Sequence, residues 1–314
     1  MPGDLKQSGG AYLTVCLNPV IQKTLIYEGL AKGEVNRCSE YRVDAAGKGV
    51  CCARVLGQVG REAIHLTQLG GPTRDWFLAM CDSDGLRPSW VESGSEIRFC
   101  TTLIDLADRT ATELVEEARR VDAGTEARVL AEFDRLLPGV STVMLSGTKA
   151  AGFSDEAMPE MAKRAAAAGK RIVLDIKGKD LTGCLPFRPL VVKPNLEELL
   201  QTYAPAEARI ARSGELGDAL RDLVARIGRE YKERHGAWLV VTRGSRPTLF
   251  WDGEALRECP TRPVDAINPI GSGDSFNVGM ATALEDGATI AEAVAEGSRL
   301  GALNAERLKP GSIE

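Results

Sequence analysis

The residues best suited to chemistry lie in the run NPIGSGDSF towards the C-terminus. Gly271, Ser272 and Gly273 are followed at once by Asp274, and the apolar segment 276–283 predicts the buried first turns of a helix. Glycines at a helix start let backbone N–H groups approach an anion closely, and the helix dipole favours negative charge there. A carboxylate in the same turn can accept a proton from a hydroxyl aimed at that anion, as phosphoryl transfer to an alcohol requires.

A short glycine motif is weak evidence when it stands alone. The alternative interpretation of this run is a Gly-rich turn in which Asp274 is an ordinary residue at the start of a helix. An anion-binding turn needs a scaffold and partners around it, so the rest of the chain decides between the two interpretations.

The second half of the chain has the pattern of such a scaffold. From about residue 140 onward, short apolar segments alternate with segments of helical composition. Short buried strands that alternate with helices predict a mostly parallel sheet covered by helices on both faces. The predicted strands are 141–145, 171–174, 189–192 and 238–242, and the predicted helices are 155–168, 216–233 and one that begins at Asn195 as its N-cap.

The N-terminal part differs. It has a buried strand at Leu13–Leu17 and a helix at Gly47–Val59. Residues 22–44 and 89–115 show alternating patterns with Thr and Arg that are typical of more exposed strands. These two segments predict a small β lid beside the main domain.

The domain organisation follows from these patterns. We expect one α/β domain over residues 11–309, with the lid inserted as two segments at approximately 21–45 and 88–116. Residues 1–10 are predicted to form a flexible tail.

The predicted sheet also indicates where a ligand binds. Ligands of an open α/β sheet lie beyond the carboxyl ends of its strands. Polar residues and glycines collect at that edge here, directly after predicted strands or at the starts of helices. These residues are Asn18-Pro19, Ser146-Gly147, Asp175, Lys193-Pro194-Asn195, Thr242-Arg243-Gly244 and Gly271–Asp274.

Composition narrows the classes of function. The 314 residues are 44% hydrophobic and 26% charged, as expected for a soluble globular protein. A net charge of -5 argues against a general binder of nucleic acid or anionic membranes, so an anionic substrate needs a local basic pocket. No apolar run approaches the length of a membrane span, and the first residues lack the pattern of a signal peptide, so the expected location is cytoplasmic.

Cysteine and histidine usage limits the chemistry further. The eight cysteines are scattered through apolar segments without a CxxC motif, which favours reduced thiols over disulfides or metal ligands. The two histidines, His65 and His235, are far apart, which argues against a zinc site or a histidine-dependent triad. The chemistry is therefore expected from carboxylates, lysines and backbone amides.

Taken together, these motifs resemble the ribokinase-like sugar kinases, specifically the phosphofructokinase B branch that includes 1-phosphofructokinases and tagatose-6-phosphate kinases. The resemblance extends from about residue 13 to residue 305. Each motif is weak alone, but all of them follow the family's order at suitable separations. The matching residues are Leu17-Asn18-Pro19, Ala46–Gly49, Arg98, Ser146-Gly147, Lys193–Asn195 with Glu197-Glu198, Val241–Gly244 and Asn268–Asp274.

The resemblance implies a three-layer α/β sandwich of the ribokinase type, with a mostly parallel central sheet and a β-sheet lid. It also implies ATP-dependent transfer of the γ-phosphoryl group to a hydroxyl of a sugar phosphate. Asp274 is then the catalytic base. The backbone amides of Gly271, Ser272 and Gly273, here called the anion cradle, stabilise charge on the transferred group.

The resemblance further implies how the substrates are held. Mg²⁺ is expected at Asn195 and Glu198, largely through water, because this ion dehydrates reluctantly. Lys48 and Arg98 are candidate clamps for an anionic substituent, the alternatives being a solvated lysine at a helix start and a surface arginine. The expected nucleotide-binding residues are Lys193, Asn195, Thr242, Gly244, Asn268 and Asn304, and the expected substrate-binding residues are Asn18, Gln22, Asp44, Gly47, Lys48, Cys51, Arg98 and Ser146.

The lid carries a further implication of the resemblance. In this family the lid closes over the sugar and shields the reaction from water, which suppresses wasteful hydrolysis of ATP. It often pairs with a second lid, so a homodimer is expected.

The sequence departs from the family pattern in the acceptor half of the site. Gln22 stands where the family usually has an Asp that binds sugar hydroxyls, and Cys51 and Phe99 stand where it usually has asparagines. Loss of these hydrogen-bonding groups is expected to lower the affinity for a polyhydroxylated ring. Asp44 could replace some of the lost acceptor capacity. Pro247, where the family usually has Gly, reshapes a turn near the nucleotide.

Three functions stay open at this point. The first is a magnesium-dependent kinase for a phosphorylated ketohexose or a related sugar. The second is the same chemistry on a nucleoside, a polyol or a less hydroxylated compound, which the changes at positions 22, 51 and 99 favour. The third is a ligand-binding or sensor protein with little turnover. Asp274 argues against the third, since binding alone does not require a positioned base.

Overall fold

The computed structural model describes residues 10–208 and 216–314. The predicted flexible tail falls almost entirely on residues 1–9, which lie outside the described residues.

A nine-stranded sheet forms the centre of the described part of the chain, and its pairings are parallel from β5 to β11. Long apolar runs such as AYLTVC are buried along their whole length, as expected for strands covered on both faces. In sheet order the strands are β13 (Leu256–Cys259), β12 (Arg246–Trp251), β11 (Trp238–Arg243), β10 (Val191–Val192), β9 (Arg171–Asp175), β8 (Val140–Ser146), β1 (Ala11–Cys16), β4 (Ala63–Leu69) and β5 (Ser89–Glu92). The pairs β11–β12 and β12–β13 are antiparallel.

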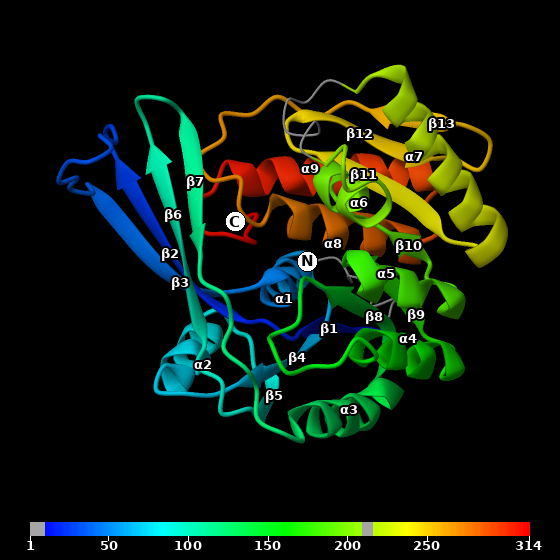
Figure 1. Cartoon of the computed structure of the whole chain (residues 1–314), viewed down its shortest axis with the longest axis horizontal. Helices are drawn as coiled ribbons and strands as arrows, with labels where there is room; N and C mark the ends of the chain where they lie inside the picture. Colours follow the sequence, from blue (N-terminus) through cyan, green and yellow to red (C-terminus); the bar gives the residue numbers. More distant parts are fainter. Residues whose placement is uncertain (1–9, 209–215) are drawn as a thin grey trace, which may run out of the picture.

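Helices cover both faces of this sheet and complete three layers (Figure 1). One core holds apolar residues of α3 (Thr125–Leu136), α4 (Ala157–Ala167), α5 (Gly178–Cys184), α6 (Leu196–Tyr203) and α7 (Asp218–Glu230). The core on the other face holds those of α1 (Lys48–Gln58), α8 (Ser272–Glu285) and α9 (Ile290–Ala305). A third, smaller cluster includes apolar residues of α2 (Arg74–Ser83).

A separate four-stranded sheet forms the lid, which stands apart from the large sheet at the left of the view (Figure 1). Its strands, in the order β3-β2-β6-β7, are β3 (Glu40–Ala46), β2 (Val20–Tyr27), β6 (Arg98–Asp105) and β7 (Thr110–Val115). The central pair, β2 and β6, is parallel, and the outer pairs are antiparallel.

The expected α/β sandwich with a β lid is confirmed, with local differences. Residues 88–97, expected in the lid, contain β5, which pairs with β4 at the edge of the large sheet. Its sequence SWVE is too short to show whether it belongs to the lid or the core. The strand expected over 189–192 is only Val191–Val192 long. Within the described residues, no helix is both long and apolar enough to cross a bilayer.

Candidate active site

A cavity of about 400 Å³ lies between the lid and the carboxyl edge of the large sheet. Its walls come from β2 and β6 of the lid, from the starts of α1, α6 and α8, and from the strand ends of the sheet. The cavity therefore gathers residues that are far apart in sequence. Twelve of the candidate residues line it: Gln22, Gly47, Lys48, Cys51, Arg98, Lys193, Asn195, Glu198, Thr242, Gly271, Gly273 and Asp274.

Asp274 lies in the first turn of α8 and is buried, with 7% of its surface exposed. Burial raises the pKa of its carboxyl group to about 7, although the positive charge of Lys48 opposes the shift. The thiol of Cys51 is hydrogen-bonded to the carboxyl group. A carboxyl group with a pKa near neutrality can both accept and release a proton at physiological pH, which suits a general base.

Two lysines and two carboxylates form a charged cluster beside Asp274. Lys48 Nζ lies 3.0 Å from Asp175 Oδ1 and 3.1 Å from Glu198 Oε1, and Lys193 Nζ lies 3.3 Å from Asp175 Oδ2. Burial alone would raise the pKa of Asp175, but Lys193 and Lys48 hold it below its usual value. Lys48 therefore contacts carboxylates in this structure, which differs from a lysine left open to receive an anion.

The anion cradle begins with a left-handed turn, since Gly271 has φ 85° and precedes the first residue of α8. Ser272 N donates to Pro269 O at 3.2 Å, which closes the turn. Gly271 and Gly273 line the cavity, and the lack of a side chain on Gly273 leaves the helix N-terminus open to it. This arrangement suits an anion, because the N-terminal end of a helix carries partial positive charge.

Asn195 is the N-cap expected at the start of α6, and it forms a capping box with Glu198. Asn195 Oδ1 accepts from Glu198 N at 2.8 Å, and Glu198 Oε2 accepts from Asn195 N at 2.9 Å. Both side chains also line the cavity. Amide and carboxylate oxygens suit a hard cation that keeps part of its water, so the donor set fits a water-mediated divalent metal. In residues 10–208 and 216–314, no three His, Cys, Asp or Glu side chains are grouped closely enough to hold a metal alone.

Seven candidate residues lie outside the lining of this cavity. Two of them, Asn268 and Asn304, are fully buried behind the anion cradle, where Asn304 Nδ2 donates to Ile270 O at 2.9 Å. Asp44 is bound by Arg42 through two hydrogen bonds of 2.6 and 2.7 Å. The candidates outside the lining are Asn18, Asp44, Ser146, Gly244, Asn268, Ser272 and Asn304.

The lid wall is less polar than the sheet wall. Gln22 Nε2 donates to Thr102 Oγ1 at 2.8 Å, so part of its amide is already used inside the lid. Arg98 Nη1 donates to Glu116 O at 3.0 Å. Reasoning from the motifs missed Val20, Cys100, Glu113 and Val115, because only the strand pairing places them on the cavity side. Asp175 was expected at this edge, but nothing in the sequence revealed its two lysine partners.

Several solved structures agree with the chain in fold. Phosphofructokinase-2 from Escherichia coli in complex with fructose-6-phosphate has a TM-score of 0.80 at 21% identity, covering 96% of each chain. Its tetrameric inhibited form has a TM-score of 0.77 at 21% identity, covering 95% of this chain and 94% of that chain. A protein from Thermotoga maritima described as a possible 1-phosphofructokinase has a TM-score of 0.81 at 18% identity, covering 95% and 93%.

The sequence itself identifies the family. Residues 15–313 match the profile of the pfkB family carbohydrate kinases, so the chain belongs to this family. The protein is therefore a carbohydrate kinase, an enzyme that transfers a phosphoryl group to a sugar hydroxyl. Such kinases use ATP and in general a divalent metal ion.

Proposed function

We propose that the protein transfers the γ-phosphoryl group of ATP to a hydroxyl of a sugar phosphate of the ketohexose type. The observation that carries this proposal is the position of Asp274, which is buried at the cavity wall in the first turn of α8. Its pKa of about 7 allows it to take the proton of an acceptor hydroxyl at physiological pH.

The cradle and the base act on the same atoms in this proposal. Asp274 accepts the hydroxyl proton while the backbone dipoles at Gly271 and Gly273, which line the cavity, stabilise the transferred group. Ser272 N donates to Pro269 O and supports the turn instead. Because the dipoles at the two glycines are fixed before the reaction, they stabilise developing charge without reorganising. Lys193, with 2% of its surface exposed, adds a positive charge held in place by Asp175.

Mg²⁺ is the metal we propose, held through water by Asn195 and Glu198. When bound, the ion would neutralise phosphate charge and orient the nucleotide. Thr242 lies on the same wall, and the nearby Gly244 has φ 63° in the turn between β11 and β12. We assign both residues to the nucleotide side of the cavity.

The acceptor would lie between Asp274 and the lid. Arg98 and Lys48 are the candidate groups for its phosphate, since a guanidinium group offers two parallel donors to phosphate. Lys48 would have to exchange part of its contact with Asp175 or Glu198 for this role.

A second candidate is the same reaction on a less hydroxylated acceptor. It is favoured by one feature of the lid wall: Val20, Ala46, Cys51 and Cys100 form a buried apolar cluster, and all four line the cavity. Apolar side chains and thiols bind hydroxyl groups poorly, so this wall offers little to a polyhydroxylated ring.

One assay separates the candidates. Purified protein with Mg-ATP is screened against fructose 1-phosphate, fructose 6-phosphate, tagatose 6-phosphate, ribose, nucleosides and inositol, and ADP release is followed. Turnover on a phosphohexose supports the first proposal, and turnover only on a nucleoside or polyol supports the second. If no acceptor turns over but one raises the melting temperature, the protein is a ligand-binding or sensor protein.

We also propose that the protein forms a homodimer through its lid and functions in the cytoplasm. The lid carries the exposed apolar residues Tyr41 and Leu114 on its outer strands. All eight cysteines are free thiols, which suits a reducing compartment. Light scattering of the purified protein tests the dimer, and Leu114→Glu should weaken it.

A further inference from the structure

The last residues of the chain, Leu308–Glu314, pack against the back of the anion cradle; we call them the C-terminal segment. A methyl group on Gly271 would lie 2.1 Å from Gly311 N, and a methyl group on Gly311 would lie 2.3 Å from Cys51 Cβ. Gly311 is therefore wedged between Gly271 of the cradle and Cys51, which is hydrogen-bonded to Asp274. The segment therefore touches the cradle directly at Gly311.

Two buried asparagines join the segment to the cradle. Asn304 Oδ1 accepts from Ser312 N at 3.0 Å, while its Nδ2 donates to Ile270 O at 2.9 Å. Asn268 Nδ2 donates to Leu308 O at 2.9 Å. The segment and the cradle therefore form one hydrogen-bonded unit on the side away from the cavity.

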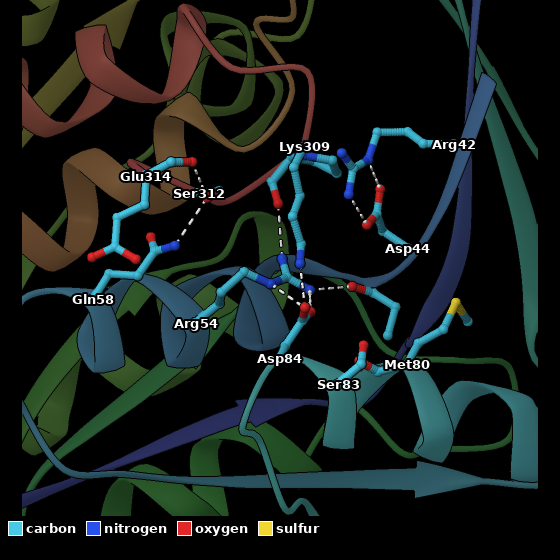
Figure 2. Close-up of polar contacts among 12 residues, drawn as sticks. Arg42, Asp44, Arg54, Gln58, Met80, Ser83, Asp84, Lys309, Ser312 and Glu314 are labelled. Carbon is cyan, nitrogen blue, oxygen red and sulfur yellow. Dashed lines mark hydrogen bonds and ion pairs between the residues drawn. The ribbon is translucent and has the colours of Figure 1, made fainter. Parts of the chain in front are cut away.

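Arg54 of α1 joins this unit to the lid (Figure 2). Its guanidinium group is 4% exposed, and it donates through Nη1 to Pro310 O at 2.8 Å and through Nη2 to Ala45 O at 2.6 Å. Nε donates to Asp84 Oδ2 at 2.9 Å, and Asp84 also binds Lys309. One planar side chain thus holds three segments that are distant in sequence.

Ala45 lies at the root of the lid. It is the last but one residue of β3 and pairs with Ile21 of β2, so its carbonyl group moves with the lid sheet. It is also only two residues before Gly47, which precedes α1 and lines the cavity. The guanidinium group of Arg54 therefore bridges the lid and the cradle: it binds the Ala45 carbonyl on the lid side and the Pro310 carbonyl on the cradle side.

We propose that Arg54 is a positioning residue that couples the lid to the anion cradle. When the lid closes on an acceptor, the guanidinium bridge carries the movement of Ala45 through Pro310 and Gly311 to Gly271. Closure on the acceptor therefore fixes the cradle in its productive geometry before the phosphoryl group is transferred. This inference rests on the proposed transfer reaction, and it explains how transfer is favoured over hydrolysis of ATP by water.

A purely structural role for Arg54 makes a different prediction, and the chain supplies a matched control. Gln58, on the same helix, also binds the C-terminal segment: its Nε2 donates to Ser312 Oγ at 2.9 Å and its Oε1 accepts from Ile313 N at 2.9 Å. Its two bonds go to the segment alone and do not reach the lid. Gln58→Leu therefore loosens the C-terminal segment and leaves the guanidinium bridge of Arg54 intact.

The test compares Arg54→Lys with Gln58→Leu. A lysine ammonium keeps the charge beside Asp84 but cannot bind both carbonyl groups with the fixed fork of a guanidinium. Two rates are measured for each variant. The first is the rate of phosphoryl transfer to the fastest acceptor of the screen, and the second is the rate of ATP hydrolysis without an acceptor. The ratio of the first rate to the second is compared. Arg54→Lys should lower this ratio about tenfold, because small misplacement of a catalytic geometry has large effects on rate. Gln58→Leu should leave it within about twofold, at temperatures where both variants are folded.

Amide hydrogen exchange supplies a readout that needs no turnover. Arg54→Lys should speed exchange at Ser272–Ser275 as well as in the C-terminal segment, whereas Gln58→Leu should speed it only in the segment. An unchanged ratio in Arg54→Lys, or an equal fall in both variants, would overturn the proposal. If the wild-type protein transfers phosphate to no acceptor, the proposed function fails and the exchange pattern alone decides the coupling. If Arg54→Lys does not fold, Asp84→Asn takes its place, because it removes the carboxylate charge that orients the guanidinium group between the two carbonyl groups, and it should lower the ratio in the same direction.

Discussion

The two walls of the cavity are built in different ways. On the sheet wall, charged side chains from separate elements hold one another: Asp175 from β9 binds Lys48 from α1 and Lys193 from the loop after β10. On the lid wall, polar groups bind within the lid itself, as Gln22 does with Thr102. The polar side chains of the sheet wall are therefore held by several elements of the domain, whereas Gln22 on the lid wall is held by a partner within the lid sheet.

This difference assigns separate tasks to the two walls. Groups that stabilise a transition state must be held before the reaction begins, and the buried network around Asp274 meets that need. Groups that select an acceptor can change without disturbing the network, because their partners are local. Of the departures from the family pattern, Gln22 lies on the lid wall, and Cys51 of α1 lines the cavity beside it. Phe99 lies outside the lining and packs against the apolar cluster that contains Ile21 and Phe77. Changes on the sheet wall should therefore cost most in rate, and changes on the lid wall mainly in acceptor affinity.

The largest effect is expected from Asp274→Asn. An amide cannot accept the proton of the hydroxyl, so kcat should fall by at least about 100-fold. The dissociation constant for Mg-ATP should change little, because the lost interaction belongs to the transition state. Steady-state kinetics and calorimetry measure the two quantities. The exposed Asp265→Asn is the control, and it should behave like the wild type.

A fall of ATP affinity in step with kcat in Asp274→Asn would contradict this assignment. It would mean that the carboxyl group binds the nucleotide, so the sheet wall would contribute to substrate affinity as well as to rate.

The next largest effects are expected at two glycines of the cradle: substitution of Gly273 should lower activity, and substitution of Gly271 should lower stability. A methyl group on Gly273 would meet only Lys193 Nζ, at 3.8 Å, so Gly273→Ala should fold normally and lose activity about tenfold by crowding the phosphate. A methyl group on Gly271 would lie 2.1 Å from Gly311 N at a φ of 85°. Gly271→Ala should therefore destabilise the protein by about 2 kcal/mol or more, as thermal unfolding would detect. Equal melting temperatures for the two variants would contradict the packing described for the C-terminal segment.

A smaller effect, on kcat/KM, is expected when the pH is changed. The folded protein has a pKa of about 7 for Asp274, and the base acts only when it is deprotonated. kcat/KM should therefore be constant above this pKa and fall about tenfold for each pH unit below it. The residual activity of Asp274→Asn corrects for ionisation of the substrates' phosphates, which titrate near pH 6. If kcat/KM does not fall as the pH is lowered from 8 to 6, Asp274 is not the group whose ionisation limits the rate.

The sequence predicted the parts of the molecule that depend on local patterns. The apolar runs of β1, β8, β9 and β11 identified the sheet, because a strand buried on both faces needs a continuous apolar sequence. Asn195 was expected to cap a helix because its residue type favours that position, and the structure has it as the N-cap of α6. Gly271–Asp274 likewise lies at a helix start, as its residue types indicate.

What the sequence could not show depends on long-range contacts. Arg54 and Pro310 are 256 positions apart, and no pattern in either segment indicates their hydrogen bond. Asn268 and Asn304 were expected to contact the nucleotide, but the structure places both behind the cradle, because their amides bind Leu308 and Ile270. Lys48 has carboxylate partners from two other elements, which only the packing of α1 against the sheet edge brings close.

The smallest effect comes from the lid wall, through Gln22→Asp. This change restores the carboxylate that the family usually has at this position, and the shorter side chain gives up the hydrogen bond to Thr102. A carboxylate has two strong acceptors for hydroxyl groups. If the acceptor is a polyhydroxylated sugar phosphate, its KM should fall a few-fold with kcat unchanged, because the gain is in uniform binding. If the natural acceptor is less hydroxylated, the buried charge lacks a partner and KM should rise by a similar factor. Thr102→Val, which removes the same hydrogen bond without adding a charge, is the control. A change in kcat with Gln22→Asp would show that the lid wall takes part in the transition state.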